Sequence, residues 1–515
     1  MGRIGKCYLL FRMICGLNIN VLPKQLPISI EAGMLTGMKM TVAVLDKSGG
    51  NATPKIIEIL KALSSEGTSR FEIATPSTVA TSKNLESLRV QKLSSPVAVG
   101  LAKSKHSTET ELVRLDDATV VFEGRIYSPS LTPIAELVAK KPRHTYDEVA
   151  EEFVKGVEGD FSLMVAKADE IVTARDPVGV EPLYYGENAS VAAFTSNRKA
   201  LWKLGIDEPK SFPPGHVAVV NREGFKFKPV KTLAYSEPTP VTLQDAAEKL
   251  QKLLEQSVQM RVQGLRKAAV AFSGGLDSSM VAFLVKKCGV DVQLVHVSLE
   301  NQPETEDAWS AAEELGLPLQ VHLFKETDIE KVIGKVVALV EEADPVKASI
   351  GVPFYWAAEK VAEAGLRVLL AGQGADELFG GYQRYVNEYL AEGDEKVRRT
   401  MYNDVASIHE SNIERDEKIC GFHDVELRLP FASYQIAEFA LGLPTELKFE
   451  KKADSLRKLV LRKAAENLGL SEAITAKPKK AVQYGTGISS ALKKLAKKRK
   501  TTLTDYVSGF FQKVE

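Results

Sequence analysis

The first half of the chain carries short hydrophobic runs separated by Gly, Pro and Ser residues. Runs of this kind, bounded by turn-forming residues, are typical of β-strands. The first convincing run is residues 41–46, and helical spacing of hydrophobic residues is confined to 54–63 and 146–155. Further strands are expected at residues 118–122, 161–165, 170–174 and 216–220. The pattern predicts a strand-rich α+β domain over residues 41–235.

The second half of the chain has a different pattern. Residues 235–242 are rich in Pro and Thr, and the amphipathic run Leu243–Val262 follows them. Hydrophobic strands and helical segments then alternate, with strands expected at 268–272, 292–299, 319–323 and 367–370 and helices at 278–287, 305–315, 329–342 and 354–364. From about residue 386 the pattern is mostly helical. We therefore predict an α/β domain over residues 243–515, a doubly wound parallel sheet with a helical C-terminal part.

Composition excludes several classes of protein. A chain of 515 residues with 44% hydrophobic residues is too long for one core, which excludes a single small binding module. Lys and Arg together number 67, as do Asp and Glu, so no overall positive charge attracts nucleic acid. The basic run 493–500 is interpreted as a solvated helix face.

Cysteine content and hydropathy indicate the cellular compartment of the protein. The four cysteines are scattered and form no C-x-x-C pair, so neither a disulfide framework nor a zinc site is expected. No window approaches the roughly 18 uninterrupted apolar residues of a membrane span. We expect a cytoplasmic protein. Residues 1–40 show no sustained period, and we expect a disordered extension or an upstream start rather than a targeting signal.

A glycine loop joins the strand at 268–272 to the helix that follows it. The segment reads Ala-Phe-Ser-Gly-Gly-Leu-Asp-Ser-Ser over residues 271–279. Two glycines let the backbone approach an anion closely, and the N–H groups of a helix N-terminus attract phosphate. Asp277 adds a hard oxygen ligand suited to Mg²⁺. The segment predicts a phosphate-binding loop, and the simpler alternative is an ordinary turn with Ser as the helix N-cap.

A second glycine loop follows the strand at 367–370. It reads Ala-Gly-Gln-Gly-Ala-Asp-Glu over residues 371–377. Loops at the carboxyl ends of parallel strands converge on one site, so Asp277 and Asp376 are predicted to hold Mg²⁺ between them. The alternative is that Asp376 and Glu377 merely complement a helix dipole.

Taken together, the two loops resemble those of the class B asparagine synthetases. S-G-G-L-D-S at 273–278 and G-Q-G-A-D-E-L-F-G-G-Y at 372–382 carry the resemblance, and V-E-L-R-L-P-F at 425–431 is similar to a third family segment. Upstream, A-R-D-P at 174–177 and P-P-G at 213–215 are similar to the glutaminase half. The resemblance covers about residues 41–495. It implies an Ntn-type amidotransferase-like sandwich followed by an ATP-pyrophosphatase domain, in an archaeal-like member of the family.

The resemblance also implies a reaction, in which ATP activates the side-chain carboxylate of aspartate and ammonia then displaces AMP. ATP and Mg²⁺ are the implied cofactors. Lys479 lies where the family places a lysine that stabilises charge on the adenylate and pyrophosphate. Gln373 lies where family members often have a Glu that handles the ammonia proton, which an amide cannot accept. The residues implied to cradle ATP are Phe272, Ser273, Gly274, Gly275, Asp277 and Ser278, with Val297 meeting adenine and Ala371 and Gly372 lining the nucleotide.

The glutaminase half departs from the family pattern at three places. Thr41 occupies the position of the nucleophilic N-terminal Cys, Glu66 falls in the degenerate counterpart of the H-R-G-P-D motif, and Glu123 replaces an oxyanion-stabilising Asn. A carboxylate facing a developing oxyanion opposes catalysis. We therefore expect glutaminase activity to be weak or lost, with ammonia supplied free or by a separate glutaminase.

Several alternatives stay open at this level. Substrate recognition is expected in residues 342–350, which match the family only loosely, so another carboxylate is a second candidate, as in lactam-forming relatives that keep an inactive glutaminase half. A non-enzymatic ATP-binding regulator is a third, and tRNA modification a fourth. We expect no nucleic-acid partner, no membrane partner and a homodimeric assembly.

Overall fold

The computed structural model describes residues 39–64, 68–88, 93–104, 110–114, 117–128, 145–452, 456–478 and 482–511. Nearly all of the predicted extension at residues 1–40 lies outside these ranges. Glu66 and Lys479 also lie outside them. The chain divides into two compact units between Thr232 and Leu233. Each unit is a body with its own core.

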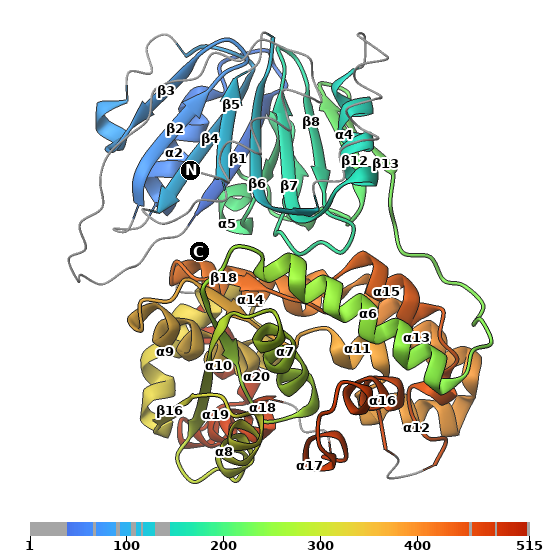
Figure 1. The fold of residues 1–515 in the computed structure, drawn as a ribbon. Coiled ribbons are helices and arrows are strands. Elements are labelled where there is room, and N and C mark those ends of the chain that lie inside the picture. The colour runs from blue at the N-terminus through green and yellow to red at the C-terminus, as the bar shows by residue number, and fades with distance from the viewer. Residues whose placement is uncertain are drawn as a thin grey trace. The chain divides into compact units, whose positions relative to one another are not determined.

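The described part of the first unit is built on two antiparallel sheets (Figure 1). One has the strand order β11-β9-β10-β1-β4-β2-β3, and the other β13-β12-β8-β7-β6-β5. The first sheet contains β1 Met40–Asp46, β2 Thr68–Ala74, β3 Val79–Ser82, β4 Val97–Ser104, β9 Tyr184–Glu187, β10 Val191–Thr195 and β11 Lys210–Ser211. The second contains β5 Thr110–Arg114, β6 Thr119–Ser128, β7 Glu158–Ala166, β8 Ile171–Arg175, β12 His216–Asn221 and β13 Gly224–Pro229.

The central strand β1 is buried on both faces, which explains its continuous hydrophobic run. Ala43 and Leu45 pack in the core between the two sheets. Val42 and Val44 point to the other face, where helix α2 (Thr53–Leu63) covers the sheet. Helix α4 (Tyr146–Gly156) covers the outer face of the second sheet in the same way, and the described part of the unit also contains α5 (Arg198–Lys203) and the 3₁₀ turn Leu85–Ser87. The predicted α+β sandwich is confirmed.

The second unit is built on a five-stranded parallel sheet within the described residues, in the order β16-β15-β14-β17-β18. The strands are β14 Lys267–Ala271, β15 Asp291–Leu299, β16 Leu319–Phe324, β17 Val368–Leu370 and β18 Glu426–Arg428. The helices that alternate with them are α6 Leu243–Val262, α7 Leu276–Lys287, α8 Glu304–Leu315, α9 Glu326–Val340 and α10 Pro345–Glu363. The predicted parallel sheet is confirmed, and β18 is a strand that the hydrophobic pattern did not predict.

The remaining elements are helical, as predicted, and several are short. They are α11 Ala375–Phe379, α12 Gln383–Glu392, α13 Asp394–Ala406, a π-helical turn His409–Ile413, α14 Glu414–Phe422, α15 Tyr434–Leu441, a 3₁₀ turn Thr445–Leu447, α16 Leu459–Asn467, α17 Glu472–Thr475, α18 Val482–Gly485, α19 Ile488–Lys498 and α20 Leu503–Phe511. None of the helices within the described ranges has the length and apolar character needed to cross a membrane.

Helix α10 corrects one prediction. The hydrophobic spacing predicted a helix over 354–364. The helix instead begins at Pro345, where the Asp344 carboxylate accepts hydrogen bonds from the backbone N–H groups of Val346 and Lys347. Pro353 lies inside the helix and is buried, so packing outweighs the lost hydrogen bond.

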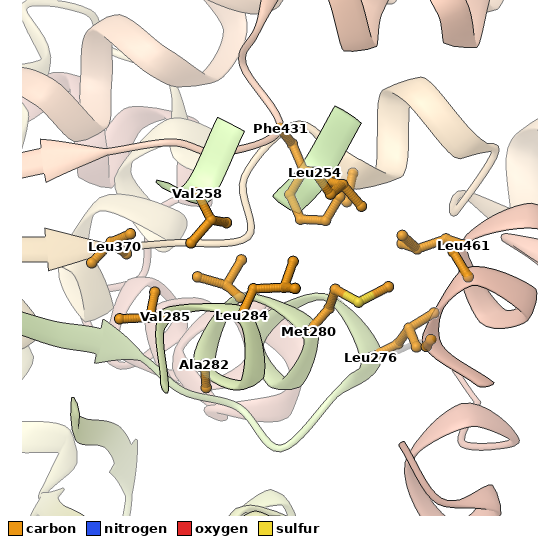
Figure 2. Close-up of a cluster of buried hydrophobic side chains, with 14 of the residues drawn as sticks. Leu254, Val258, Leu276, Met280, Ala282, Leu284, Val285, Leu370, Phe431 and Leu461 are labelled. Carbon is orange, nitrogen blue, oxygen red and sulfur yellow. The ribbon is translucent and has the colours of Figure 1, made fainter. Parts of the chain in front are cut away.

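Buried side chains fix the start of α7, the helix that follows the first glycine loop. Figure 2 shows Met280 and Leu284 of α7 together with Leu254 and Val258 of α6 in one apolar cluster. Leu461 of α16 and Phe431 belong to the same cluster. Full burial of such side chains is worth about 1.5–3 kcal/mol each. The cluster therefore holds the N-terminus of α7 in a fixed place beside β14.

Candidate active site

A cavity lies where the loops after β14, β15 and β17 converge. It contains about 1080 Å³ of empty space out to its open mouth. Its walls come from the three loops, from the side of α10 and from the segment Val482–Thr486. Strand ends of a parallel sheet meet at one edge, so the topology brings these distant stretches of sequence together.

Most of the site residues predicted from the sequence line this cavity. Gly274 and Gly275 form the turn of the first loop without lining the cavity. Lys479 lies outside the described residues. The predicted residues that line the cavity are Phe272, Ser273, Asp277, Ser278, Val297, Ala371, Gly372, Gln373 and Asp376.

The first loop has the backbone geometry of an anion-binding turn. Gly274 has a φ of +68°, and a Cβ atom there would lie 2.5 Å from the carbonyl oxygen of Asp307. The residue that caps α7 is Gly275, not a serine, which argues against the simple capping alternative. Ser278 instead ties the loop together, since its hydroxyl accepts from the Ser273 N–H at 3.3 Å and donates to the Gly275 carbonyl at 3.2 Å.

Asp277 and Asp376 meet at one point, as their positions after parallel strands predicted. Each carboxylate lies 2.6 Å from the ammonium nitrogen of Lys458. Lys458 is 2% exposed and has a φ of 61° at the start of α16. Gly381 allows the close approach, because a Cβ atom there would lie 1.8 Å from Asp376 Oδ1. Sequence reasoning missed Lys458, which carries no motif and lies 181 positions from Asp277.

This pair of carboxylates fits a divalent cation. They already surround a positive charge, and oxygen ligands are what Mg²⁺ prefers. Within the described residues no group of three or more His, Cys, Asp or Glu side chains is arranged to hold a metal. A cation at Asp277 and Asp376 would therefore complete its shell with oxygens from phosphate or water. That composition is the one expected of a magnesium–nucleotide site.

Glu377 is a further carboxylate in the cavity wall, and it is 4% exposed. Its Oε1 accepts a hydrogen bond from the Tyr382 hydroxyl at 2.6 Å and another from Asn412 Nδ2 at 2.7 Å. Burial raises the pKa of Glu377, and the neighbouring Asp376 raises it further. From the sequence, Glu377 was considered only as a carboxylate that complements a helix dipole.

The wall formed by α10 is apolar. Ile350, Pro353, Phe354 and Ala357 line it. Of the segment 342–350, which the sequence suggested for substrate recognition, only Ile350 lines the cavity.

The two described flanks of the predicted lysine loop contact the first glycine loop, the end of β15 and helix α8. Lys477 Nζ lies 3.2 Å from Asp307 Oδ1 and donates to the Gly274 carbonyl at 3.3 Å. On the other side, the Leu299 N–H donates to the Thr486 carbonyl at 3.1 Å. A Cβ atom at Gly485 would lie 1.7 Å from Glu304 Oε2. These contacts attach both described flanks of residues 479–481 to the rim of the cavity.

The first unit holds a different cluster of charged groups. The Thr41 hydroxyl donates to Glu123 Oε2 at 2.6 Å, and the Thr41 N–H donates to the Ser196 hydroxyl at 3.0 Å. Lys39 Nζ lies 3.3 Å from Glu123 and 2.8 Å from Glu181. Burial, with a smaller contribution from Glu123, raises the pKa of Glu181 to about 7 against the opposing charge of Lys39. The polar side chains of this cluster thus pair with one another inside the unit.

The retained motif A-R-D-P has a structural role in this unit. Arg175 donates to three backbone carbonyls at 2.7 Å, those of Gly179, Glu181 and Phe212. Asp176 Oδ1 accepts from the N–H groups of Val178, Gly179 and Val180. Buried polar groups need such partners, so the motif holds the loop at 178–181 whatever chemistry the unit performs.

A two-sheet sandwich, together with paired aspartates and two glycine loops at the strand ends of a parallel sheet, fits an amide-forming carbon–nitrogen ligase. Comparison with known proteins agrees. The family model of asparagine synthase matches residues 249–392 and 387–514, and that of the glutamine amidotransferase domain matches residues 132–203. The chain belongs to the asparagine synthase family.

Similar proteins include a protein of Methanocaldococcus jannaschii provisionally named glutamine-hydrolysing asparagine synthetase 1. It is 32% identical over 402 residues, covering 69% of this chain and 73% of its own length. A glutamine-hydrolysing asparagine synthetase of Triphysaria versicolor is 28% identical, covering 63% of this chain and 57% of its own length. A solved glutamine phosphoribosylpyrophosphate amidotransferase from B. subtilis aligns at 13% identity over 55% of this chain and 80% of its own, with a TM-score of 0.31 that is too low to bear on the fold.

Proposed function

We propose that the protein is an ATP-dependent asparagine synthetase that uses ammonia and has weak or no glutaminase activity. In the proposed reaction, aspartate attacks ATP through its side-chain carboxylate, pyrophosphate leaves, and ammonia displaces AMP to give asparagine. The observation that carries the proposal is the convergence of Asp277 and Asp376 at the cavity between two glycine loops. Membership of the asparagine synthase family supports the choice of reaction.

The residues of the cavity have separate tasks in this proposal. Ser273 and the N–H groups at the start of α7 bind the phosphates, while Val297 and Ala371–Gly372 contact the nucleoside. Asp277 and Asp376 would hold Mg²⁺, which supplies positive charge to the phosphates of ATP when bound. Lys458 would contribute its positive charge beside the two carboxylates, where it lies in the structure. Lys479 is proposed to stabilise charge on the adenylate and pyrophosphate.

The weak glutaminase activity is inferred from the charged cluster of the first unit. The hydroxyl of Thr41 is hydrogen-bonded to a carboxylate, and its backbone nitrogen belongs to a peptide bond after Met40. An N-terminal nucleophile needs a free α-amino group as its base. Glu123 adds negative charge where an oxyanion would form. Ammonia, free or from a separate glutaminase, is therefore the proposed nitrogen donor.

A second candidate is a synthetase that activates another carboxylate. It is favoured by the apolar α10 wall of Ile350, Pro353, Phe354 and Ala357, which offers no charged group to the α-amino and α-carboxylate groups of aspartate. An acceptor with an apolar body would fit that wall better.

Pyrophosphate release from the full chain tests both candidates. The reaction contains ATP, Mg²⁺ and aspartate, with ammonium in one arm and glutamine in the other, and Asp277→Ala as the inactive control. Release with ammonium but not with glutamine supports the proposal. Equal release with glutamine contradicts the loss of glutaminase activity. Release that is independent of aspartate but dependent on another carboxylate favours the second candidate.

A further inference from the structure

A second cavity lies in the same unit as the candidate active site and shares none of its lining residues. It contains about 280 Å³ of empty space, against 1080 Å³ in the active-site cavity. Its walls come from the segment before α6, from α13, from the end of α15 and from Lys448, which follows the 3₁₀ turn Thr445–Leu447. Lys448 and Arg398 are cations, and none of the lining residues that the structure describes is a carboxylate.

Lys448 is a buried cation without a counterion. It is 3% exposed, and its ammonium group makes neither a hydrogen bond nor an ion pair with any residue that the structure describes. Burial lowers the pKa of Lys448 to about 7, and Arg398 lowers it further against the opposing charge of Asp394. A buried charge is stabilised by a partner of opposite sign, so an anion in the cavity would favour the charged form of Lys448.

Arg398 supplies a second positive charge to the cavity wall. It belongs to α13, and its side chain is 10% exposed. Its Nη1 pairs with Glu237 and Glu395, and its Nη2 donates to the Ser236 carbonyl at 2.7 Å. Its Nε donates to no acceptor in the part of the chain that the structure describes. A buried lysine and a buried arginine on one small cavity thus leave donors that an anion can accept from.

Three carboxylates lie near these cations but outside the cavity wall. Glu237 and Glu395 lie 3.0 and 3.4 Å from Arg398 Nη1, but their side chains are 82% and 54% exposed, so water and salt screen their charge. The third, Asp394, accepts a hydrogen bond from the Thr445 hydroxyl. The inner wall of the cavity therefore remains positively charged.

We propose that this cavity binds a small inorganic anion, such as chloride or phosphate, between the Lys448 ammonium group and the Arg398 guanidinium group. Pockets for drug-sized ligands measure about 300–1,000 Å³, so the space fits an inorganic ion better than a nucleotide. The Lys448 carbonyl accepts from the Leu459 N–H at 3.0 Å, next to Lys458 of the candidate active site. The bound anion would therefore stabilise the segment that leads to Lys458.

Hydrogen–deuterium exchange of the full chain without nucleotide tests the site. The peptides followed cover residues 233–237 and 441–449. Chloride or phosphate replaces gluconate at constant ionic strength, because gluconate is too large for the cavity. A bound anion must leave before the cavity opens, so protection of these peptides should rise about tenfold for each tenfold increase in anion above its dissociation constant.

The variant Lys448→Met removes the charge and keeps a long side chain. Its protection should not depend on either anion. In gluconate it should equal or exceed the protection of the unchanged protein, because no uncompensated charge remains. Lys252→Met, at an exposed position of α6, is the matched control and should respond to the anion as the unchanged protein does.

A direct measurement decides the case if Lys448→Met folds poorly. Crystals of the unchanged full chain are soaked in bromide or in arsenate, the heavier analogues of chloride and phosphate. At least one of the two should give an anomalous-scattering peak between Lys448 Nζ and the Arg398 guanidinium group.

The possible results separate the site from a general effect of salt. A rise in protection that Lys448→Met abolishes, or the expected peak, supports the proposal. An equal rise in all three proteins would overturn it, as would an absence of any response to both anions or peaks found only elsewhere. Neither measurement contains ATP or aspartate, so the outcome does not depend on the proposed function.

Discussion

Each of the two units contains a lysine placed between two carboxylates, yet the carboxylates of the two clusters differ in their exposure to solvent. In the first unit, Lys39 lies between Glu123 and Glu181, both 1% exposed and packed inside the sandwich. In the second, Lys458 lies between Asp277 and Asp376, which are 16% and 14% exposed and line a cavity. The same ingredients thus form a closed structural cluster in one unit and an open site in the other.

The types of residue in a cluster therefore do not by themselves define a binding site. A buried ion pair surrounded by side chains contributes to the fold, whereas carboxylates that keep one side towards a cavity can exchange their lysine for a ligand. If this distinction holds, substitutions in the first cluster should change stability and substitutions in the second should change activity.

The largest effect is expected from the open cluster. Asp376→Asn should lower aspartate-dependent ATP–pyrophosphate exchange about 10²–10³-fold, because one of two charges that hold the cation is lost. Its free energy of unfolding should change little. Asp291→Asn, at an exposed aspartate that begins β15, is the matched control. A large loss of stability without a selective loss of exchange would remove the contrast between the two clusters.

An effect on stability alone is expected from the closed cluster. Lys39→Met leaves Glu123 and Glu181 without their shared cation, and breaking a buried ion pair costs about 3–5 kcal/mol. Hydrogen–deuterium exchange of peptides from β1 and β8 in the full chain should report faster opening. Exchange in β14 and β17, which belong to the other unit, should stay as it was. Unchanged protection in β1 would show that the pair contributes nothing to the fold.

The stability of the first unit should depend on pH because of Glu181, with a smaller effect than that of Lys39→Met. Its pKa is raised from 4.5 to about 7, chiefly by burial, so the folded state binds this proton more tightly than the unfolded chain. The stabilisation is complete below the unfolded pKa and is lost as pH rises through about 7, with a size of about 1–3 kcal/mol. Asp176, with a pKa raised to about 6, acts in the same direction.

The measurement is the protection of β1 at pH 5.5 and pH 8, corrected for intrinsic exchange. Protection should be greater at the lower pH, and Glu181→Gln should flatten the dependence to what Asp176 contributes. A dependence of the opposite sign would mean that Glu181 is ionised in the folded protein through this range.

The last substitution, Thr41→Cys, is expected to leave glutamine hydrolysis unchanged. Thr41→Cys restores the nucleophile type of the family, but the residue stays buried in β1 and its nitrogen stays in a peptide bond. Glutamate release from glutamine should therefore remain at the level of the unchanged protein. Measurable glutamine hydrolysis in this variant would show that the closed cluster opens enough to bind glutamine.

Much of the fold could be predicted from local patterns. Alternation of strands and helices after residue 243 indicated the parallel sheet, because that pattern reflects helices on both faces. Strand β18 was not predicted because Glu426 and Arg428 make its sequence polar, although both residues pair with β17 in the sheet. Helix α10 begins at Pro345 and not at residue 354, because capping by Asp344 and the burial of Pro353 outweigh the tendency of proline to interrupt a helix.

The candidate site could likewise be predicted only in part from the sequence. The two glycine loops and the aspartates after them follow from the sequence by itself, because a phosphate loop is a local structure whose residues are close together in the chain. Lys458, Asn412 and the partners of Glu377 were decided by the tertiary structure alone. Those residues come from separate helices, and no local period or spacing relates them to the loops. The sequence by itself thus indicated which groups are candidates to bind phosphate and metal, while packing decided that Lys458 lies between the two aspartates, because that contact joins residues far apart in the chain.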